Sequence, residues 1–247
     1  MTQVTSHPPA PETAQNARRA KAALIVAHGQ PSDPEPAAAE LAALASLVAA
    51  CLPGWHVASA TLAEDDALPR EVARAGASGL VYPMFMAGGW FTRTHLPERM
   101  RDAGGAGWHI LPPFGQDTAV QALAVTLAQE AGCRTGGQML LAAHGSFRSP
   151  APSDVANAVA AMIGAKLGLA RAEAAFIDQS PRLAEVSGFG PDAVCLPFFA
   201  ARGGHVTDDL PKALGDAGFA GQVLPPLGLD PRVPGLIARA LEAALQA

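Results

Sequence analysis

The chain contains two copies of one unit, and this duplication constrains its fold more than any other feature. Three segments recur in the same order: AALIVAHGQ at 22–30 as QMLLAAHGS at 138–146, LPERMRDAG at 96–104 as LPKALGDAG at 210–218, and LPPFGQD at 111–117 as LPPLGLD at 224–230. The offsets are 116, 114 and 113 residues. A period this long indicates duplicated domains, because solenoid repeats run only ~20–50 residues.

The repeat divides the 247 residues into three parts. Residues 21–134 are predicted to form an N-terminal lobe and residues 135–247 a C-terminal lobe, with the join near Arg134–Gly137. Residues 1–20 are rich in Pro, Thr, Gln and Ala, which predicts a disordered lead-in. The apolar content of 49% and the charged content of 16% exclude an intrinsically disordered protein for the chain as a whole.

Each unit alternates short apolar runs with longer Ala-rich stretches. In the second unit we expect strands at 139–144, 173–177, 193–199 and 221–224, and helices at 153–167, 208–217 and 231–246. The first unit follows the same order, from a strand at 22–27 to a helix at 118–131. This alternation predicts an α/β fold in which each lobe is a four-stranded parallel sheet flanked by helices. The strands lack polar alternation, as expected for strands that are buried on both sides.

Polar residues in the second unit follow the predicted strands. The first strand ends in His144–Ser146, the second is followed by Asp178, and the third by Arg202–His205 (RGGH). Ligands of open parallel sheets bind beyond the carboxyl ends of the strands, so these residues are expected on one ligand-facing edge. Two imidazoles and a carboxylate suit a first-row divalent metal ion. Either histidine alone is more often a turn residue, and Asp178 equally fits a capping role before QSPRL.

The first unit keeps only part of this set. His28 matches His144, Trp90 stands at the position of His205 after two glycines, and the position of Asp178 falls near Thr61. His95 fits either the same cleft or a cap of the following helix, and we favour the cap. The site of the first lobe is therefore predicted to be degenerate. An apolar loop instead occupies the ligand edge, which favours a flat hydrophobic ligand; its members are Met84, Met86, Trp90 and Phe91.

At these residues the sequence resembles the class II tetrapyrrole chelatases, and in particular the long two-domain sirohydrochlorin cobaltochelatases. The matching strings are LLAAHGS, AFIDQSPRL, LPFFAARGGHV and LPPLGLD in the second unit, with LIVAHGQ, YPMFMAGGW and LPERM in the first. The resemblance covers nearly the whole chain from Ala22 onward. It implies a chelatase-like pair of lobes with a ligand cleft between them.

The resemblance also implies an activity: ATP-independent insertion of a divalent metal into sirohydrochlorin or a related tetrapyrrole, in cobalamin or siroheme biosynthesis. Cobalt is the first choice of metal, with iron and nickel as alternatives, and no organic cofactor is expected. Relatives bind metal through residues that correspond to His144 and His205. Asp178 occupies the third catalytic position, where relatives generally carry Glu. These side chains can hold the metal and accept the protons that leave the macrocycle.

Further residues are predicted to bind the substrate. Sirohydrochlorin carries eight carboxylates, and arginine suits forked contacts with carboxylates. Arg202 is the first candidate by position and Arg148 the second. The other predicted substrate contacts are Gly203, Gly204, Ser146, Trp90 and His28.

Composition limits the other partners. The net charge of −5 and the lack of any Lys/Arg run argue against nucleic acid, and no apolar stretch reaches the ~20 residues that span a bilayer. The N-terminus has no apolar segment of the secretory type, and the three cysteines form no CxxC pair. We therefore expect a cytoplasmic protein that is a monomer or a homodimer.

Two other functions compete with the enzyme. A non-catalytic protein that carries tetrapyrrole or metal would explain the eroded first unit, although both histidines remain in the second. A hydrolase that uses Ser146 is a weaker alternative, because the chain has no GxSxG motif around that residue.

Overall fold

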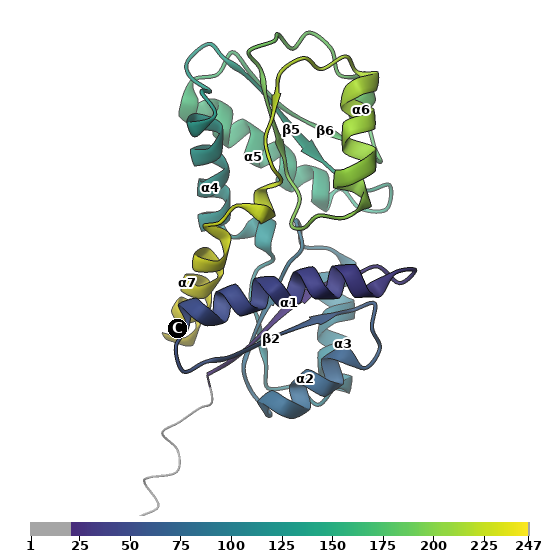
Figure 1. The fold of residues 1–247 in the computed structure, drawn as a ribbon, viewed down its shortest axis with the longest axis vertical. Coiled ribbons are helices and arrows are strands. Elements are labelled where there is room, and N and C mark those ends of the chain that lie inside the picture. Colours follow the sequence, from purple (N-terminus) through teal and green to yellow (C-terminus); the bar gives the residue numbers. More distant parts are fainter. Residues whose placement is uncertain (1–20, 247) are drawn as a thin grey trace, which may run out of the picture.

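The computed structural model describes residues 21–246, which form two α/β lobes (Figure 1). The first repeat runs β1 (Ala22–Ala27), α1 (Pro34–Cys51), β2 (His56–Thr61), α2 (Ala67–Ala75), β3 (Leu80–Pro83), α3 (Leu96–Asp102), β4 (His109–Ile110) and α4 (Thr118–Glu130). The second runs β5 (Gln138–Ala143), α5 (Ala151–Leu167), β6 (Arg171–Phe176), β7 (Val194–Pro197), α6 (Leu210–Asp216), β8 (Gln222–Val223) and α7 (Val233–Gln246). The predicted lead-in at residues 1–20 lies outside the described residues.

Each repeat contributes one four-stranded parallel sheet, which confirms the predicted fold class. The strand orders are β2-β1-β3-β4 and β6-β5-β7-β8, and every pairing is parallel. The central strands β1 and β5 are buried almost throughout, as their continuous apolar sequences predicted. β7 ends at Pro197, within the apolar run 193–199, because proline has no N–H to continue the ladder.

Helices cover both faces of each sheet. On the outer face of the first sheet, α2 and α3 pack through Leu68, Val72 and Met100 against Leu24 and its neighbours. In the second lobe α6 covers the corresponding face. A larger apolar core lies on the inner faces of both sheets and runs continuously from one lobe to the other.

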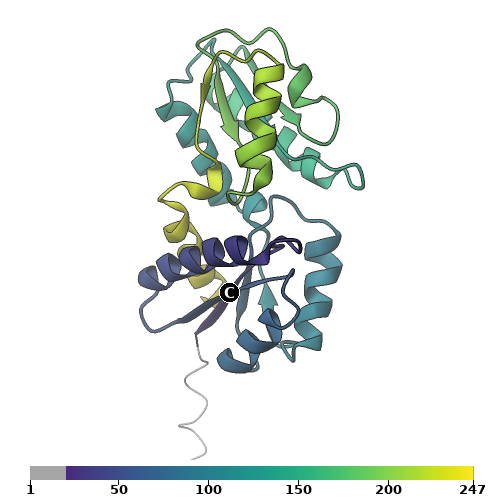
Figure 2. The same cartoon turned by 45° about the vertical axis from the view of Figure 1, so that its right-hand side comes forward.

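The last helix of each repeat lies on the other lobe. Helix α4 closes the first repeat but packs against α5 and β7, whereas α7 closes the second repeat but packs against α1 and β3. Figures 1 and 2 show α7, in yellow, crossing to lie beside α1. The residue ranges 21–134 and 135–247 thus describe the two sequence repeats, while in space the repeats exchange their closing helices. Both helices bury apolar side chains in the continuous core, which ties the lobes together.

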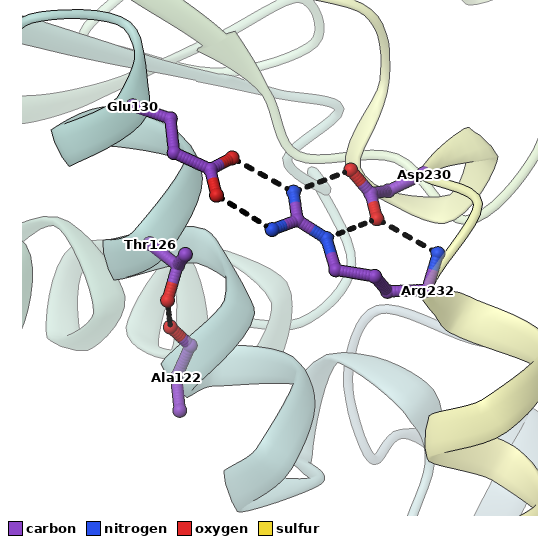
Figure 3. A network of polar contacts seen from close by, with 5 residues as sticks. All are labelled: Ala122, Thr126, Glu130, Asp230 and Arg232. Carbon is purple, nitrogen blue, oxygen red and sulfur yellow. Dashed lines mark hydrogen bonds and ion pairs between the residues drawn. The ribbon is translucent and has the colours of Figure 1, made fainter.

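Arg232 joins the two exchanged helices where they pass each other (Figure 3). Its guanidinium donates hydrogen bonds to both carboxylate oxygens of Glu130, at the end of α4, at 2.8 and 2.9 Å. It also donates to both oxygens of Asp230, just before α7. These hydrogen bonds hold the pKa of the Asp230 carboxyl and the pKa of the Glu130 carboxyl below their usual ranges.

Within residues 21–246, every helix falls short of the length or apolarity that crossing a bilayer requires.

Candidate active site

A cavity of about 860 Å³ lies between the lobes. One wall is apolar and comes mainly from helix α1 of the first lobe, with Met84 beside it. The other wall is polar and comes from the segments that follow β5 and β7 in the second lobe. The apolar wall consists of Ala37, Leu41, Ala43, Leu44, Leu47 and Met84, and the polar wall includes His144, Arg202, Gly203, Gly204, His205, Asp208 and Asp209.

Sheet topology brings His144 and His205 together. In the order β6-β5-β7-β8, the chain leaves β5 toward one side of the sheet and returns to place β7 on the other. The crevice at such a switch point lies between the carboxyl ends of the two strands. His144 directly follows β5, and His205 begins the π-helical turn His205–Asp209 after β7. The two side chains therefore meet, although 61 residues separate them in the chain.

The turn after β5 requires glycine. Gly145 has φ +78°, a conformation that L side chains rarely adopt, and a Cβ there would lie 2.7 Å from Cγ of Gln179. Gln179 in turn accepts a hydrogen bond from the Ser146 N–H at 2.6 Å. The His144 carbonyl accepts from the Asp178 N–H at 2.9 Å. These contacts fix the backbone from which the His144 ring projects.

The two imidazoles face each other through their Nε2 atoms, which are 2.8 Å apart. The ring centroids are 4.1 Å apart and the ring planes are nearly perpendicular, at 87°. The His144 side chain is 38% exposed and that of His205 is 49% exposed, so solvent and small ions reach the pair. Two nitrogens bound to one metal ion at ~2.0–2.1 Å lie roughly 3.0–3.4 Å apart for ordinary bond angles. The observed spacing is close to that range.

Hydrogen bonds at the Nδ1 atoms determine whether each Nε2 atom carries a proton or a free lone pair. Nδ1 of His144 lies 3.0 Å from the Gly145 carbonyl oxygen, and Nδ1 of His205 lies 2.7 Å from Oδ2 of Asp209. Both partners are acceptors only, so each Nδ1 carries the proton and donates it. Two neutral rings then direct Nε2 lone pairs at each other, and these repel unless a proton or a metal ion lies between them. The pair therefore has the chemistry to take up a proton or a metal ion between the two rings.

Asp178 approaches the opposite side of His144. Its Oδ2 lies 3.5 Å from Nδ1 of His144, the nitrogen that faces away from His205. In this geometry the carboxylate acts on the ring of His144 and on its proton, and it is turned away from the space between the two Nε2 atoms. Within residues 21–246, no set of three or more His, Cys, Asp and Glu side chains converges as a ready-made metal cluster.

The other predicted site residues divide between the cavity and the surface. Arg202, Gly203, Gly204 and His28 line the cavity, the last of these from the first lobe. Three others are absent from the cavity wall formed by residues 21–246: Ser146, Arg148 and Trp90. The Ser146 hydroxyl accepts a hydrogen bond of 3.1 Å from the Arg148 N–H, within a local turn. Trp90 is 59% exposed and stacks on His95 at 4.8 Å between ring centroids.

The structure corrects the alignment of the first lobe at the position of His205. The π-helical turn Phe91–His95 occupies the place of His205–Asp209, and a Leu-Pro pair follows each turn. Phe91, and not Trp90, therefore corresponds to His205, because the first repeat has one more residue between its glycines and its turn. Phe91 packs on His28 with ring centroids 4.3 Å apart, which reproduces the ring pair of the second lobe.

Two further positions of the first lobe can be matched to the second lobe, one by its backbone hydrogen bond and one by its place in the π-helical turn. The Ala63 N–H donates to the His28 carbonyl as the Asp178 N–H does to that of His144, so Ala63, two residues past Thr61, corresponds to Asp178. His95 corresponds to Asp209. The favoured capping role of His95 is wrong, because its side chain makes no capping hydrogen bond and stacks on Trp90 instead.

Comparisons with known proteins identify the family of the chain. The sequence model named CbiX matches residues 138–244. A solved structure described as CbiX, the terminal enzyme for biosynthesis of siroheme in denitrifying bacteria, is 46% identical with a TM-score of 0.82, over 91% of this chain and 99% of that chain. The chain belongs to the CbiX family. It is thus a member of the class II metal chelatases, as its sequence motifs indicated.

More distant structures share the fold of this CbiX-family chain. SirB from Bacillus subtilis with Fe3+ is 15% identical with a TM-score of 0.68, over 90% of this chain and 94% of that one. The sirohydrochlorin chelatase SirB from Bacillus subtilis subspecies spizizenii, in complex with cobalt, is 16% identical with a TM-score of 0.67, over 92% and 95%. No curated protein sequence matches the chain.

Sequence reasoning missed two polar residues of this CbiX-family site. Asp209 contacts His205, and Glu40 of α1 accepts a hydrogen bond from the Arg202 N–H at 2.9 Å. Asp209 stands four residues after His205, a spacing that pairs side chains on any helical turn and that could have identified it. Glu40 had no such signal, because its partner lies 162 residues away in the other repeat.

Proposed function

We propose that this protein inserts a divalent metal ion into sirohydrochlorin without ATP, and that His144 and His205 hold the metal before transfer. The observation that carries the proposal is the pair of Nε2 atoms 2.8 Å apart on the wall of a cavity between two lobes. Two imidazoles supply only two ligands, and a first-row divalent ion takes four to six. The remaining coordination positions are available to water and then to the pyrrole nitrogens.

The cavity suits a flat macrocycle that carries acidic side chains. Leu44 and Leu47 of α1 offer an apolar surface to one face of the ring, on the wall opposite the imidazoles. The metal would then enter from the polar wall and the ring would rest on α1. Arg202, with the backbone of Gly203 and Gly204 beside it, is placed to bind a peripheral carboxylate. His28 completes the contact from the first lobe, whereas Ser146, Arg148 and Trp90 would reach the substrate only at the edge of the site.

The reaction exchanges two pyrrole N–H protons for one metal ion. As each metal–imidazole bond breaks, the Nε2 atom that is released can accept a proton, so two imidazoles match two protons. The carboxylate of Asp178, 3.5 Å from Nδ1 of His144, lies beside one of the two rings that receive these protons. Water then removes the protons, since both side chains are partly exposed.

For the biological metal we propose iron. The relative that is 46% identical is described as the terminal enzyme for siroheme biosynthesis, and siroheme is the iron complex of sirohydrochlorin. Cobalt, the first choice from sequence, remains a substrate to test, because raw affinity of a site for first-row metals does not select the biological one. We also propose a cytoplasmic protein in which one chain suffices, because both walls of the cavity come from the same chain.

Metallation of sirohydrochlorin tests the proposal directly. Purified protein is mixed anaerobically with sirohydrochlorin and Fe2+, Co2+ or Ni2+ in parallel, and the loss of the metal-free absorption is followed against a protein-free blank. We expect accelerated metallation, with Fe2+ giving the highest kcat/KM. The His144→Ala/His205→Ala variant is expected to fall to the blank rate.

His109→Ala is the matched control, because this histidine lies on the edge strand β4 and is exposed outside the cavity. It should retain the wild-type rate. If the double variant metallates as fast as His109→Ala, the site is wrong. Tight binding of sirohydrochlorin with no acceleration for any metal would instead support the non-catalytic carrier.

A further inference from the structure

The turn that carries His205 has an unusual geometry. His205–Asp209 is a single π-helical turn between the Gly203–Gly204 loop and α6, and the Leu210 N–H bonds back to the His205 carbonyl, five residues earlier. Such isolated π turns are rare and occur frequently at functional sites. This one brings the carboxylate of Asp209 to 2.7 Å from Nδ1 of His205.

This contact sets the direction in which His205 offers its lone pair. A carboxylate accepts but does not donate, so it keeps the proton of the neutral ring on Nδ1 and leaves Nε2 unprotonated. Nε2 then faces Nε2 of His144. A carboxylate behind a metal-binding imidazole also fixes the ring rotation and strengthens the ring as a ligand.

The first lobe supplies an internal comparison. There the same π turn carries Phe91 in place of His205 and His95 in place of Asp209. His95 stacks on Trp90 and contacts Phe91 edge-on, 5.9 Å between centroids. The lobe that lacks the imidazole at this turn therefore also lacks the carboxylate, although the turn itself is retained. The carboxylate accompanies the imidazole and is not required to form the turn.

We propose that Asp209 is a positioning residue for metal delivery: it holds His205 in the Nδ1–H tautomer and in the rotation that points Nε2 at His144. The proposal rests on the proposed function, in which this pair receives the metal. Asp209 acts through the imidazole and does not itself bind the metal.

The test compares Asp209→Ala, which removes the acceptor, with Asp209→Asn, which keeps an acceptor oxygen but removes the charge. Asp216→Asn is the matched control. Asp216 lies in α6, directly after the π turn, where it is exposed and makes a similar i,i+4 contact with Lys212. Co2+ affinity is measured without tetrapyrrole from the visible absorption of the bound ion. KM for the metal, KM for sirohydrochlorin and kcat are measured separately, and thermal melting checks that each variant folds.

For Asp209→Ala we expect the Kd for Co2+ and the KM for metal to rise by about 10–100-fold, with KM for sirohydrochlorin within about two-fold of wild type. Asp209→Asn should show a smaller rise, of roughly 3–10-fold, because the hydrogen bond to Nδ1 remains. Asp216→Asn should match wild type. Equal Co2+ affinities for Asp209→Ala and Asp216→Asn, or an equal rise of both KM values, would overturn the proposal.

The tautomer itself gives a readout that needs neither metal nor turnover. The ¹⁵N shifts of the His205 ring are expected to show the Nδ1–H form in wild type and its loss in Asp209→Ala. If the ring keeps the same tautomer without the carboxylate, Asp209 does not position it. If the wild type shows the tautomer and binds Co2+ but metallates nothing, the proposed function fails and the positioning role stands. If Asp209→Ala does not fold, Asp209→Asn decides through the Co2+ titration, and a Co2+ affinity equal to that of Asp216→Asn would overturn the proposal.

Discussion

The backbone N–H of Arg202 donates a hydrogen bond of 2.9 Å to the carboxylate of Glu40, and this contact joins the two lobes across the cavity. Arg202 precedes the glycines of the turn that carries His205, whereas Glu40 lies on the apolar helix α1. Glu40 thus places one negative charge in a cavity that is proposed to bind a polyanionic macrocycle. A substrate carboxylate and Glu40 would compete for the same N–H.

Removing this charge is expected to strengthen substrate binding. Glu40→Gln keeps an oxygen for the Arg202 N–H but removes the like-charge repulsion, which for two charges ~4 Å apart in water amounts to about 1 kcal/mol. KM for sirohydrochlorin should therefore fall by roughly 5-fold at low salt, and the gain should shrink at high salt, where exposed charges are screened. Steady-state kinetics at two ionic strengths measure both effects.

Glu35→Gln is the control for Glu40→Gln. Glu35 lies in the first turn of the same helix and is exposed, and it does not line the cavity. The two variants have the same net charge, so a general electrostatic effect would change both alike. Equal KM values for the two variants would show that Glu40 does not compete with the substrate.

The His28–Phe91 ring pair of the first lobe can be used to test whether a second imidazole there creates a metal site. Phe91→His places a second imidazole beside His28, whose ring lies 4.3 Å from that of Phe91. In the His144→Ala/His205→Ala background, this substitution is expected to restore binding of one Co2+ ion. The affinity should be about 10–100-fold below wild type, because His95 supplies no carboxylate at that turn. Equilibrium dialysis gives the stoichiometry and the Kd.

Phe85→His in the same background is the comparison. Phe85 belongs to the same aromatic group, with its ring 6.3 Å from that of Phe91. It should bind no additional ion. If Phe91→His also binds none, the first lobe has lost more than its ligands.

The sheets were predictable from sequence because the buried strands are continuous apolar runs and the strand-helix alternation is regular. The boundaries of β5 and β7 follow from the runs around Leu141 and Leu196. The exchange of α4 and α7 was not predictable. Both helices are Ala-rich with a buried apolar face, and periodicity shows that a helix is covered without showing which lobe covers it.

The sharing of one sheet edge by His144 and His205 was predictable from their places after two strands, but the pairing of Trp90 with His205 was wrong. Comparison of the two repeats by sequence pairs Trp90 with His205, because two glycines precede each residue. The backbone instead aligns the π turns, which end at His95 and Asp209, directly before Leu96 and Leu210. The Leu-Pro pairs that follow the two turns, 114 residues apart, were the sequence signal that pairs Phe91 with His205.

The three cysteines are expected to differ sharply in reactivity. Burial raises the pKa of the Cys195 thiol, in the middle of the second sheet, to about 12, and burial also raises the pKa of Cys133. The thiolate is the reactive form, so these two thiols stay protonated and inaccessible near neutral pH. Cys51 is exposed at the end of α1. Alkylation of the native protein at pH 7.5, read by mass spectrometry, should label Cys51 first, and Cys51→Ser should abolish the fast phase.

The contact of Arg232 with Glu130 and Asp230 is expected to stabilise the exchanged helices in a pH-dependent way. Hydrogen bonds from Arg232 lower the pKa of both carboxyls, so their stabilising effect is present above the unfolded pKa of ~4 and is lost as the pH falls below it. Arg232→Ala should therefore lower Tm by roughly 2–4 °C at pH 7, and by progressively less below about pH 4. Arg239→Ala is the control, since Arg239 lies on the same helix α7 and has no ion-pair partner among residues 21–246. Thermal melts of both variants from pH 3 to pH 8 measure the difference, and a Tm loss for Arg232→Ala that is equal at pH 7 and pH 3 would show that these ion pairs are not its cause.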